Sequence, residues 1–207
     1  MKKLLSLLVL CTLALPSFAG VNGNVGIWSD YFWRGESQSM GNKSIQGSLG
    51  LDYKGMYGGV WAAQVEGIGD ANYEYDLYAG YRLDVNDSWY VDGGVIQYRY
   101  DDKAVDKLEE WYVKGGNNWL ELAMWTDMDN SENDYKEVTL KMPMVKVVDI
   151  SLRHGMRADD SDYQQLMVSK SFDNGVVMGL EVLDNAREGE FMDNAAFFMA
   201  YEWLYAN

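Results

Sequence analysis

Charged side chains recur at every second residue along stretches that are otherwise apolar or aromatic. The clearest stretch holds Glu74, Asp76 and Arg82 on one parity and Leu77 and Tyr81 on the other. Successive side chains of a β-strand point to opposite faces, so this spacing predicts a strand with one charged and one apolar face. Carboxylates and guanidinium groups gathered around water attract or repel ions, and the chemistry indicated is ion selectivity.

In the other predicted strands, charged residues likewise occupy alternate positions, which assigns them to one shared inner face. An Arg or Lys facing lipid would cost up to about 2–4 kcal/mol at the bilayer midplane, and pointing inward avoids that cost. Acids outnumber bases in this set, so an open pore lined by it is expected to prefer cations. The candidates for the lumen and its mouth are Asp30, Arg34, Glu36, Glu74, Asp76, Arg82, Glu110, Glu121, Glu137, Arg153 and Glu181.

Two interpretations of this lumen remain open. Arg34, Arg82 and Arg153 would plug a narrow lumen if they paired with carboxylates of neighbouring strands. Strand number does not decide, because about twelve strands lie between filled eight-stranded barrels and open porins. Arg34 is correspondingly either a gating or selectivity residue or one half of an ion pair that anchors a loop.

About twelve antiparallel strands are predicted to hold these residues. Tight connections such as 53–56 and 142–144 alternate with longer acidic ones such as 101–107 and 127–134. Outer-membrane barrels have short periplasmic turns and longer extracellular loops, so the fold class expected is all-β, an antiparallel transmembrane β-barrel. The predicted strands are 22–34, 43–53, 56–66, 73–85, 89–100, 108–114, 119–126, 135–142, 145–156, 163–172, 175–183 and 195–205.

Aromatic residues gather near the ends of these strands, where the apolar ring and wet polar tip of Tyr and Trp suit a membrane interface. Those expected at the outer interface are Trp33, Tyr73, Tyr75, Tyr98, Tyr100, Trp125, Tyr135 and Tyr163. Those expected at the inner interface are Tyr53, Tyr57, Trp89, Tyr90, Trp119, Phe172, Trp203 and Tyr205.

Residues 1–19 have the pattern of a secretory signal peptide, with Lys2 and Lys3, an apolar stretch and a small-x-small cleavage site. Residues 20–207 would then form one barrel domain. The single cysteine, Cys11, lies in the removed segment, which leaves no disulfide or thiol-based metal site. The net charge of −15 disfavours nucleic acid as a partner. The mean hydropathy of −0.29 fits a barrel and a soluble periplasmic protein equally.

Other chemistries are weakly indicated. His154 is the only histidine. Ser151, at odd separation, would lie on the opposite face of the strand, and the distance of Ser161, which is in a loop, cannot be read from the sequence, so a catalytic pair is not the favoured interpretation. The acidic loops 127–134 and 159–162 lack the glycine and spaced glutamate of an EF-hand. No catalytic residue, metal or other cofactor is therefore expected.

Several motifs in the first hundred residues belong together. They are Ser29-Asp30-Tyr31, Arg34-Gly35, Ser37-Gln38, Ile45-Gln46-Gly47, Tyr57-Gly58-Gly59-Val60-Trp61 and Tyr75-Asp76-Leu77-Tyr78-Ala79-Gly80-Tyr81. In these motifs the chain resembles the TorF-type porin family, small outer-membrane barrels of Gram-negative bacteria. The resemblance implies an outer-membrane location and a channel, with no established substrate or catalytic residues.

The function expected is passive diffusion of small solutes with a preference for cations. The expected partners are outer-membrane lipid and lipopolysaccharide, the transported solutes or cations, and the barrel-assembly machinery, which recognises a terminal aromatic strand such as 197–205. Three alternatives remain: a plugged structural or adhesive barrel, a barrel hydrolase, and a soluble periplasmic ligand-binding β-barrel.

Overall fold

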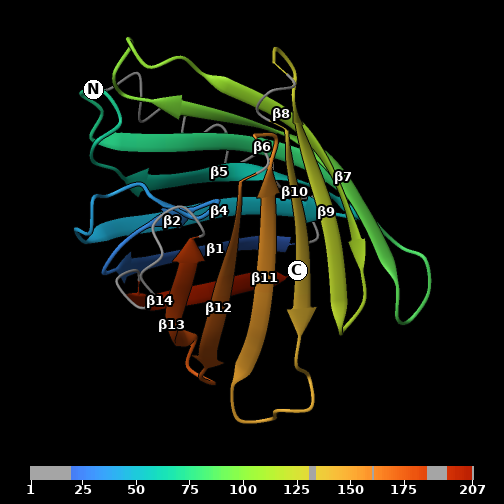
Figure 1. Cartoon of the computed structure of the whole chain (residues 1–207). Coiled ribbons are helices and arrows are strands. Elements are labelled where there is room, and N and C mark those ends of the chain that lie inside the picture. The colour runs from blue at the N-terminus through green and yellow to red at the C-terminus, as the bar shows by residue number, and fades with distance from the viewer. Residues whose placement is uncertain (1–19, 131–133, 160, 186–194, 207) are drawn as a thin grey trace, which may run out of the picture.

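The computed structural model describes residues 20–130, 134–159, 161–185 and 195–206, so the predicted signal peptide lies outside it. In this part of the chain twelve antiparallel strands form a closed barrel, which confirms the predicted fold (Figure 1). The strands are β1 (Gly20–Trp28), β4 (Ser44–Tyr53), β5 (Met56–Gln64), β6 (Tyr73–Asp84), β7 (Tyr90–Tyr100), β8 (Leu108–Gly116), β9 (Leu120–Asp127), β10 (Tyr135–Lys141), β11 (Asp149–Arg157), β12 (Asp162–Ser171), β13 (Val176–Asn185) and β14 (Ala195–Ala206).

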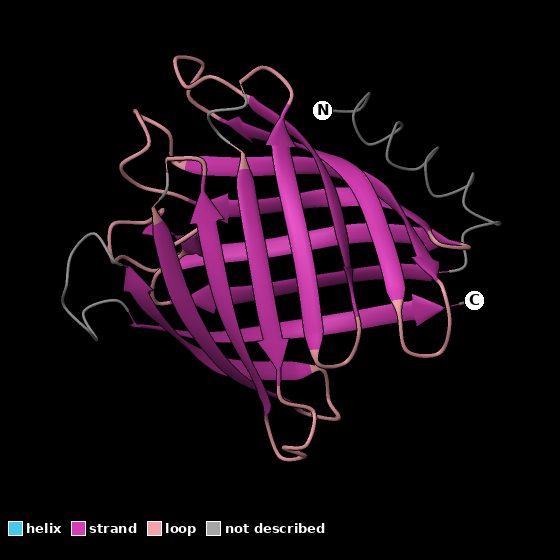
Figure 2. Cartoon of the chain, turned by 45° about the vertical axis from the view of Figure 1, so that its right-hand side comes forward, coloured by secondary structure: helices cyan, strands magenta, loops and turns pink. Residues whose placement is uncertain are grey.

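Each strand pairs with its neighbour in the chain, and β1 pairs with β14 to close the barrel. Closure leaves no free sheet edge, so the ladder hydrogen bonds are satisfied around the whole ring. Figure 2 shows the strands tilted around the wall, with the connections gathered at its two ends. No helix of the described residues has the length and apolar character needed to cross a membrane.

The wall has one polar and one apolar face. In β6, Leu77 and Tyr81 are exposed on the outer face, whereas Glu74 and Asp76 are buried on the inner one. Because partners in register share a face, this assignment passes from strand to strand around the barrel. It also settles the faces of β7 and β12, which the sequence pattern left ambiguous.

The two ends differ in their connections, though less regularly than the sequence predicts. At one end, called the turn end, residues 54–55 join β4 to β5. At the opposite, long-loop end, residues 29–43 join β1 to β4 and residues 65–72 join β5 to β6. Gly20 and Ala206 are paired at the turn end, so both described ends of the chain lie there.

The chain turns at 142–145 as predicted, but the predicted start of the next strand at residue 145 is wrong. β11 begins at Asp149, which makes the connection 142–148 as long as the loop 101–107 at the other end. Pro143 has no N–H for a strand ladder, and the chain turns instead, with the Val145 N–H donating to the carbonyl of Met142 at 3.2 Å.

The first predicted strand, 22–34, is also wrong in its second half. β1 ends at Trp28, and the chain forms a small hairpin of β2 (Phe32–Trp33) and β3 (Glu36–Ser37). The carboxylate of Asp30 accepts hydrogen bonds from the hydroxyls of Ser37 (2.6 Å) and Ser39 (2.8 Å). Such local side-chain bonds compete with a strand ladder and favour a turn.

Arg34 and Gly35 form the two-residue turn of this hairpin, called here the loop hairpin (residues 32–37). Their φ angles are 49° and 81°. Two positive φ angles in succession suit the twist of a tight β-hairpin, and the second is unstrained because Gly lacks a Cβ. The turn therefore presents the Arg34 side chain at its tip.

Candidate functional site

The structure places the eight candidate residues of the strands on the inner face of the wall. Glu110, Glu137 and Glu181 are buried there along with Glu74 and Asp76, whereas Arg82 at the turn end is exposed to the lumen. The positions, strand by strand, are Glu74, Asp76 and Arg82 in β6, Glu110 in β8, Glu121 in β9, Glu137 in β10, Arg153 in β11 and Glu181 in β13.

Arg34 reaches from the loop hairpin across the lumen to Glu110. Its two terminal nitrogens donate to the two carboxylate oxygens at 2.7 and 2.6 Å, and the Glu110 side chain is fully buried. The rings of Trp33 and Tyr135 each lie 4.4 Å from the guanidinium carbon, within cation–π range. Of the two interpretations of Arg34 from the sequence, the structure shows the ion pair, and it joins the loop to the barrel wall.

Burial alone lowers the pKa of Arg34, but the hydrogen bonds and charge of Glu110 outweigh it, so the pKa is raised. The guanidinium therefore stays charged at any physiological pH, and a bidentate pair of this kind is among the stronger polar contacts in proteins. Two further contacts hold the same turn. Arg157 donates to the backbone carbonyl of Arg34, and it lies 3.6 Å from the carboxylate of Glu36.

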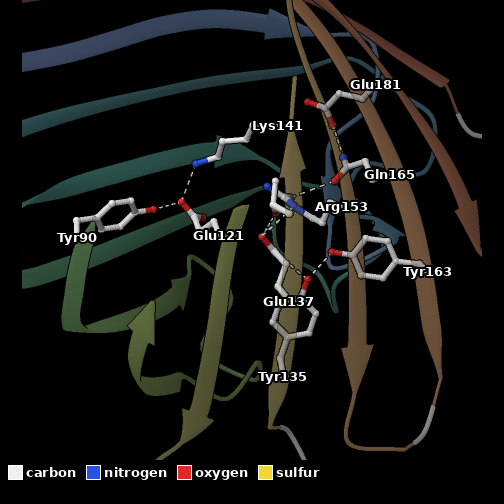
Figure 3. Close-up of polar contacts among 10 residues, drawn as sticks. Tyr90, Glu121, Tyr135, Glu137, Lys141, Arg153, Tyr163, Gln165 and Glu181 are labelled. Carbon is white, nitrogen blue, oxygen red and sulfur yellow. Dashed lines mark hydrogen bonds and ion pairs between the residues drawn. The ribbon is translucent and has the colours of Figure 1, made fainter. Parts of the chain in front are cut away.

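A second set of contacts crosses four adjacent strands, β10 to β13 (Figure 3). Arg153 lies 3.1 Å from the carboxylate of Glu137 and donates to the amide oxygen of Gln165 at 3.1 Å. Gln165 in turn donates to Glu181 at 2.7 Å. The single Arg153 charge is thus shared between two carboxylates, one of them through an amide.

Tyrosine hydroxyls complete this network. Tyr135 donates to Glu137 at 2.9 Å, and its oxygen lies 2.6 Å from that of Tyr163. The ring of Tyr163 also packs on the loop hairpin, because a Cβ on Gly35 would lie 2.5 Å from it. The loop hairpin and the network therefore pack as one unit in the half of the lumen nearest the long loops.

At the turn end the contacts are sparser. Glu121 accepts from Lys141 at 3.0 Å and from the hydroxyl of Tyr90, as Figure 3 shows. Tyr57 donates to Asp92 at 2.5 Å. These residues sit near the ends of their strands.

The cavities of the lumen include one at each end. The one at the turn end has a volume of about 930 Å³, and the one at the long-loop end about 520 Å³. Among the described residues they share no lining residue, and Glu137 and Arg153 line neither. The loop hairpin borders the second cavity through Arg34 and Glu36.

Both cavities are acidic. The charged residues that line the first are Asp84, Asp87, Glu121 and Asp149 against Arg82 and Lys141. Those that line the second are Glu36, Asp106, Asp127, Asp129, Asp134 and Asp159 against Arg34, Lys107 and Arg157. Carboxylates thus outnumber bases two to one at each end of the lumen.

Six of the eight aromatic residues expected at the outer interface face the lumen instead, which corrects that prediction. The hydroxyls explain the difference for the tyrosines among them, because Tyr98 donates to Glu110 at 3.1 Å and Tyr100 to Glu74 at 3.4 Å. A buried hydroxyl needs such a partner, whereas a lipid-facing one would lack it. The six are Trp33, Tyr98, Tyr100, Trp125, Tyr135 and Tyr163.

The remaining aromatic positions are closer to expectation. Tyr73 and Tyr75 are exposed on the outer face at the long-loop end. At the turn end, Tyr57 and Tyr90 point inward to carboxylates, and the side chain of Tyr205 lies outside the described part of the chain. Among the residues expected at the inner interface, the exposed side chains are Trp89, Trp119, Phe172 and Trp203.

Gln165, Arg157 and the inward tyrosines are lumen residues that sequence reasoning missed. Their even separation along the strand from residues already assigned to the lumen was a usable signal. Arg157 is four residues from Arg153, and Tyr135 is two from Glu137, so each shares the face of a residue already assigned to the lumen.

His154 lies on the outer face of β11, with Nε2 3.9 Å from the carboxylate of Asp162. Ser151 lines the turn-end cavity on the inner face, and the hydroxyl of Ser161 donates to Asp159 at 2.5 Å. The described residues contain no group of three His, Cys, Asp or Glu side chains that could hold a metal ion. Residues 131–133 and 160 of the two acidic loops lie outside the described residues.

Comparison with solved structures finds barrels of the same fold. A KdgM porin has a TM-score of 0.60 at 9% identity over 89% of this chain and 98% of that one. A KdgM porin in complex with disordered oligogalacturonate has a TM-score of 0.58 at 9% identity, over 91% and 99%. Outer membrane phospholipase A from Escherichia coli has a TM-score of 0.46 at 13% identity, over 92% and 98%.

Comparison with curated proteins gives no match. One family model does match, over residues 16–203, and its description is "Bacterial protein of unknown function (Gcw_chp)". The match covers nearly the whole barrel. It does not carry the TorF-type name, so that resemblance stays a prediction. The chain belongs to the Gcw_chp family of bacterial proteins.

Proposed function

We propose that this protein is an outer-membrane channel for passive diffusion of small solutes, with a preference for cations. The observation that carries the proposal is the acidic lining of both lumen cavities. Carboxylates in a wall of low dielectric constant hold a negative potential, which concentrates cations and repels anions. In this proposal the turn end is periplasmic and the long-loop end extracellular.

The membrane location rests on the outer face. Leu49, Leu77, Leu122 and Leu140 are about half exposed there, from four different strands. A soluble protein rarely leaves so large an apolar surface in water, which argues against the soluble ligand-binding alternative. The same face would meet outer-membrane lipid and lipopolysaccharide.

Spin labels provide a direct test of the wall. A label at position 77 should be reached by a quencher dissolved in lipid, and a label at position 76 by one dissolved in water. The reverse pattern would mean that the lipid-facing and lumen-facing sides of the wall have been assigned the wrong way round, and it would reject the proposed ion path.

The last strand supports the proposed engagement of the barrel-assembly machinery. Phe197, Met199, Tyr201 and Trp203 alternate along β14 and are exposed on its outer face. The proposal includes no catalytic activity, since His154 and Ser151 lie on opposite faces of β11.

The proposed solute differs from the ligand of the structural neighbour. The KdgM porin complex holds oligogalacturonate, which is a chain of sugar carboxylates. Two acidic cavities in series would repel such a polyanion. We therefore propose small cations and neutral solutes for this chain.

Conductance in planar bilayers tests this function. Current steps are expected, with a reversal potential in a potassium chloride gradient that shows cation preference. The double variant Asp84→Asn/Asp149→Asn, in the turn-end cavity, should weaken that preference. Glu109→Gln is a matched control on the outer face of β8 and should leave it unchanged. An absence of current steps at high protein load would reject the channel.

A second candidate is a plugged structural or adhesive barrel. The ion pair of Arg34 and Glu110, which ties the loop hairpin to the wall, specifically favours it. The two candidates differ in whether this contact opens. A wild-type protein that stays closed, with a variant that conducts once the pair is broken, would support the plugged barrel.

A further inference from the structure

Three polar atoms on neighbouring strands of the inner wall have no hydrogen-bond partner. They are Nε2 of Gln46, Oε2 of Glu74 and Oδ1 of Asp76. The residues are only 6%, 2% and 5% exposed. Buried polar atoms are nearly always paired, and an unpaired one costs about 1–3 kcal/mol. Three such atoms on one inner face are candidate ligands for a bound ion.

The strand register brings these atoms to one patch of the wall. Gln46 of β4 is opposite Ala63 of β5, and Ala63 is opposite Glu74 of β6. Asp76 follows Glu74 by two residues and so lies on the same face.

The two carboxylates have no cationic partner among the ion pairs of the described residues. The nearby guanidinium of Arg34 is already held by both oxygens of Glu110. The hydroxyl of Tyr100 donates to the other oxygen of Glu74, Oε1, at 3.4 Å, but it brings no positive charge. A buried carboxylate without a counter-charge is strongly unfavourable, so a cation would stabilise the patch.

The donor set indicates which cation. Carboxylate and amide oxygens are ligands for hard cations, and the amide of Gln46 can present its oxygen after a half-turn. Two carboxylates provide too few ligands for a dehydrated divalent ion, which takes six or more oxygens. No group of three acidic, His or Cys side chains is present in the described residues to supply more. A partly hydrated monovalent ion fits this set.

We propose that Gln46, Glu74 and Asp76 bind one sodium or potassium ion. The site is one side chain away from the long-loop cavity, because Tyr100 both lines that cavity and donates to Glu74. The role of this site in selecting cations rests on the proposed channel function. Binding of the ion can be tested whether or not the protein is a channel.

The binding test measures thermal unfolding of the purified barrel in detergent by intrinsic tryptophan fluorescence. The salts are sodium, potassium or N-methylglucamine chloride at equal ionic strength and pH. A bound ion stabilises only the folded state, so sodium or potassium at about ten times its dissociation constant should raise the midpoint by about 3 °C. Glu74→Gln/Asp76→Asn should lose this difference, and Glu109→Gln should keep it.

Equal midpoints of the wild type in all three salts would overturn the site, and a buried water or shared proton would then satisfy the carboxylates. Mobility on gels with and without heating shows whether the double variant folds. If the double variant does not fold, Asp76→Asn alone replaces it. The comparison of the wild-type midpoints in the three salts still decides whether the site exists.

Reversal potentials separate this proposal from the channel itself. A conducting wild type whose cation preference falls in Glu74→Gln/Asp76→Asn, but not in Glu109→Gln, supports both. Alkali-dependent stability without current steps supports the site and rejects the channel. A conducting wild type whose preference and midpoint are unchanged in the double variant rejects the site and leaves the channel standing.

Discussion

Replacing Glu110 by Gln should release the loop hairpin from the lumen. The substitution keeps the size of the side chain but removes the negative charge at the fully buried end of the Arg34–Glu110 pair. Removing one partner of a buried ion pair costs about 3–5 kcal/mol, because the other charge stays buried without compensation. The amide that replaces the carboxylate would also point a donor at the guanidinium, which has no acceptor.

The expected result is displacement of the loop rather than unfolding of the barrel. Arg34 is at the tip of a two-residue turn, so its charge can reach water when the hairpin moves. The rings of Trp33 and Tyr135 contact the guanidinium before and after the substitution, so their attraction cancels from the change, which is set by the lost pair. A net change of about 3 kcal/mol lowers the ratio of inserted to displaced hairpin about a hundredfold.

Two assays report on the hairpin. Trypsin cleaves after Arg34, so cleavage there should be slow in the wild type and fast in Glu110→Gln. Single-channel conductance should rise in the same variant. Glu109→Gln removes a neighbouring carboxylate from the opposite face and should change neither measurement.

A neutral double variant sharpens the test. Arg34→Met/Glu110→Leu removes both charges and leaves no unpaired one, so protease protection of the loop hairpin and low conductance should return toward the wild-type level. Chymotrypsin, which cleaves after Trp33, measures this protection because the variant lacks the trypsin site at position 34. A folded Glu110→Gln protein with wild-type conductance and wild-type protection of Arg34 would refute the reasoning.

Other parts of the structure make further predictions. Gly35→Ala adds a Cβ at a φ of 81° that would lie 2.5 Å from the Tyr163 ring, so trypsin sensitivity of the loop hairpin should rise. Asp101 accepts from the N–H groups of Asn72 (2.8 Å) and Tyr73 (3.1 Å), and these backbone bonds lower its pKa. Because the pKa of Asp101 is depressed in the folded state, its contacts stabilise the folded loops at pH values above its unfolded-state pKa of about 3.9. This stabilisation is lost as the pH falls through the folded-state pKa. Amide exchange at Asn72 and Tyr73, corrected for intrinsic rates, should therefore accelerate as the pH falls below about 3.9, and unchanged protection there would contradict the assignment.

Much of the barrel was predictable because strand faces are a local property. The alternation of Glu74, Asp76 and Arg82 with Leu77 and Tyr81 follows from backbone geometry alone, and the structure places these residues accordingly. Strand number followed from counting such stretches between turn signals. The boundaries near Trp28 and Asp149 did not follow, because local turn contacts ended one strand early and started the other late.

The aromatic residues show why a local rule can mislead. Position near a strand end is shared by residues that face lipid and residues that face the lumen, so it did not separate Tyr73 from Tyr98. Parity would have separated them, since Tyr98 lies on the same face as Asp92. Its hydroxyl meets Glu110, a partner that only the closed barrel brings to it.

The amino-acid sequence by itself determined an antiparallel barrel with an acidic inner face, because alternation, turn chemistry and the cost of charge in lipid act within short segments. The tertiary structure alone decided how that face is used. Arg34 and Glu110 are 76 residues apart, and they meet only when the barrel closes and the loop hairpin turns inward. Gln46 and Glu74 likewise lie on one face, on either side of Ala63, only through the register of three strands. Contacts of this kind depend on distances across the lumen, and no local pattern encodes those distances.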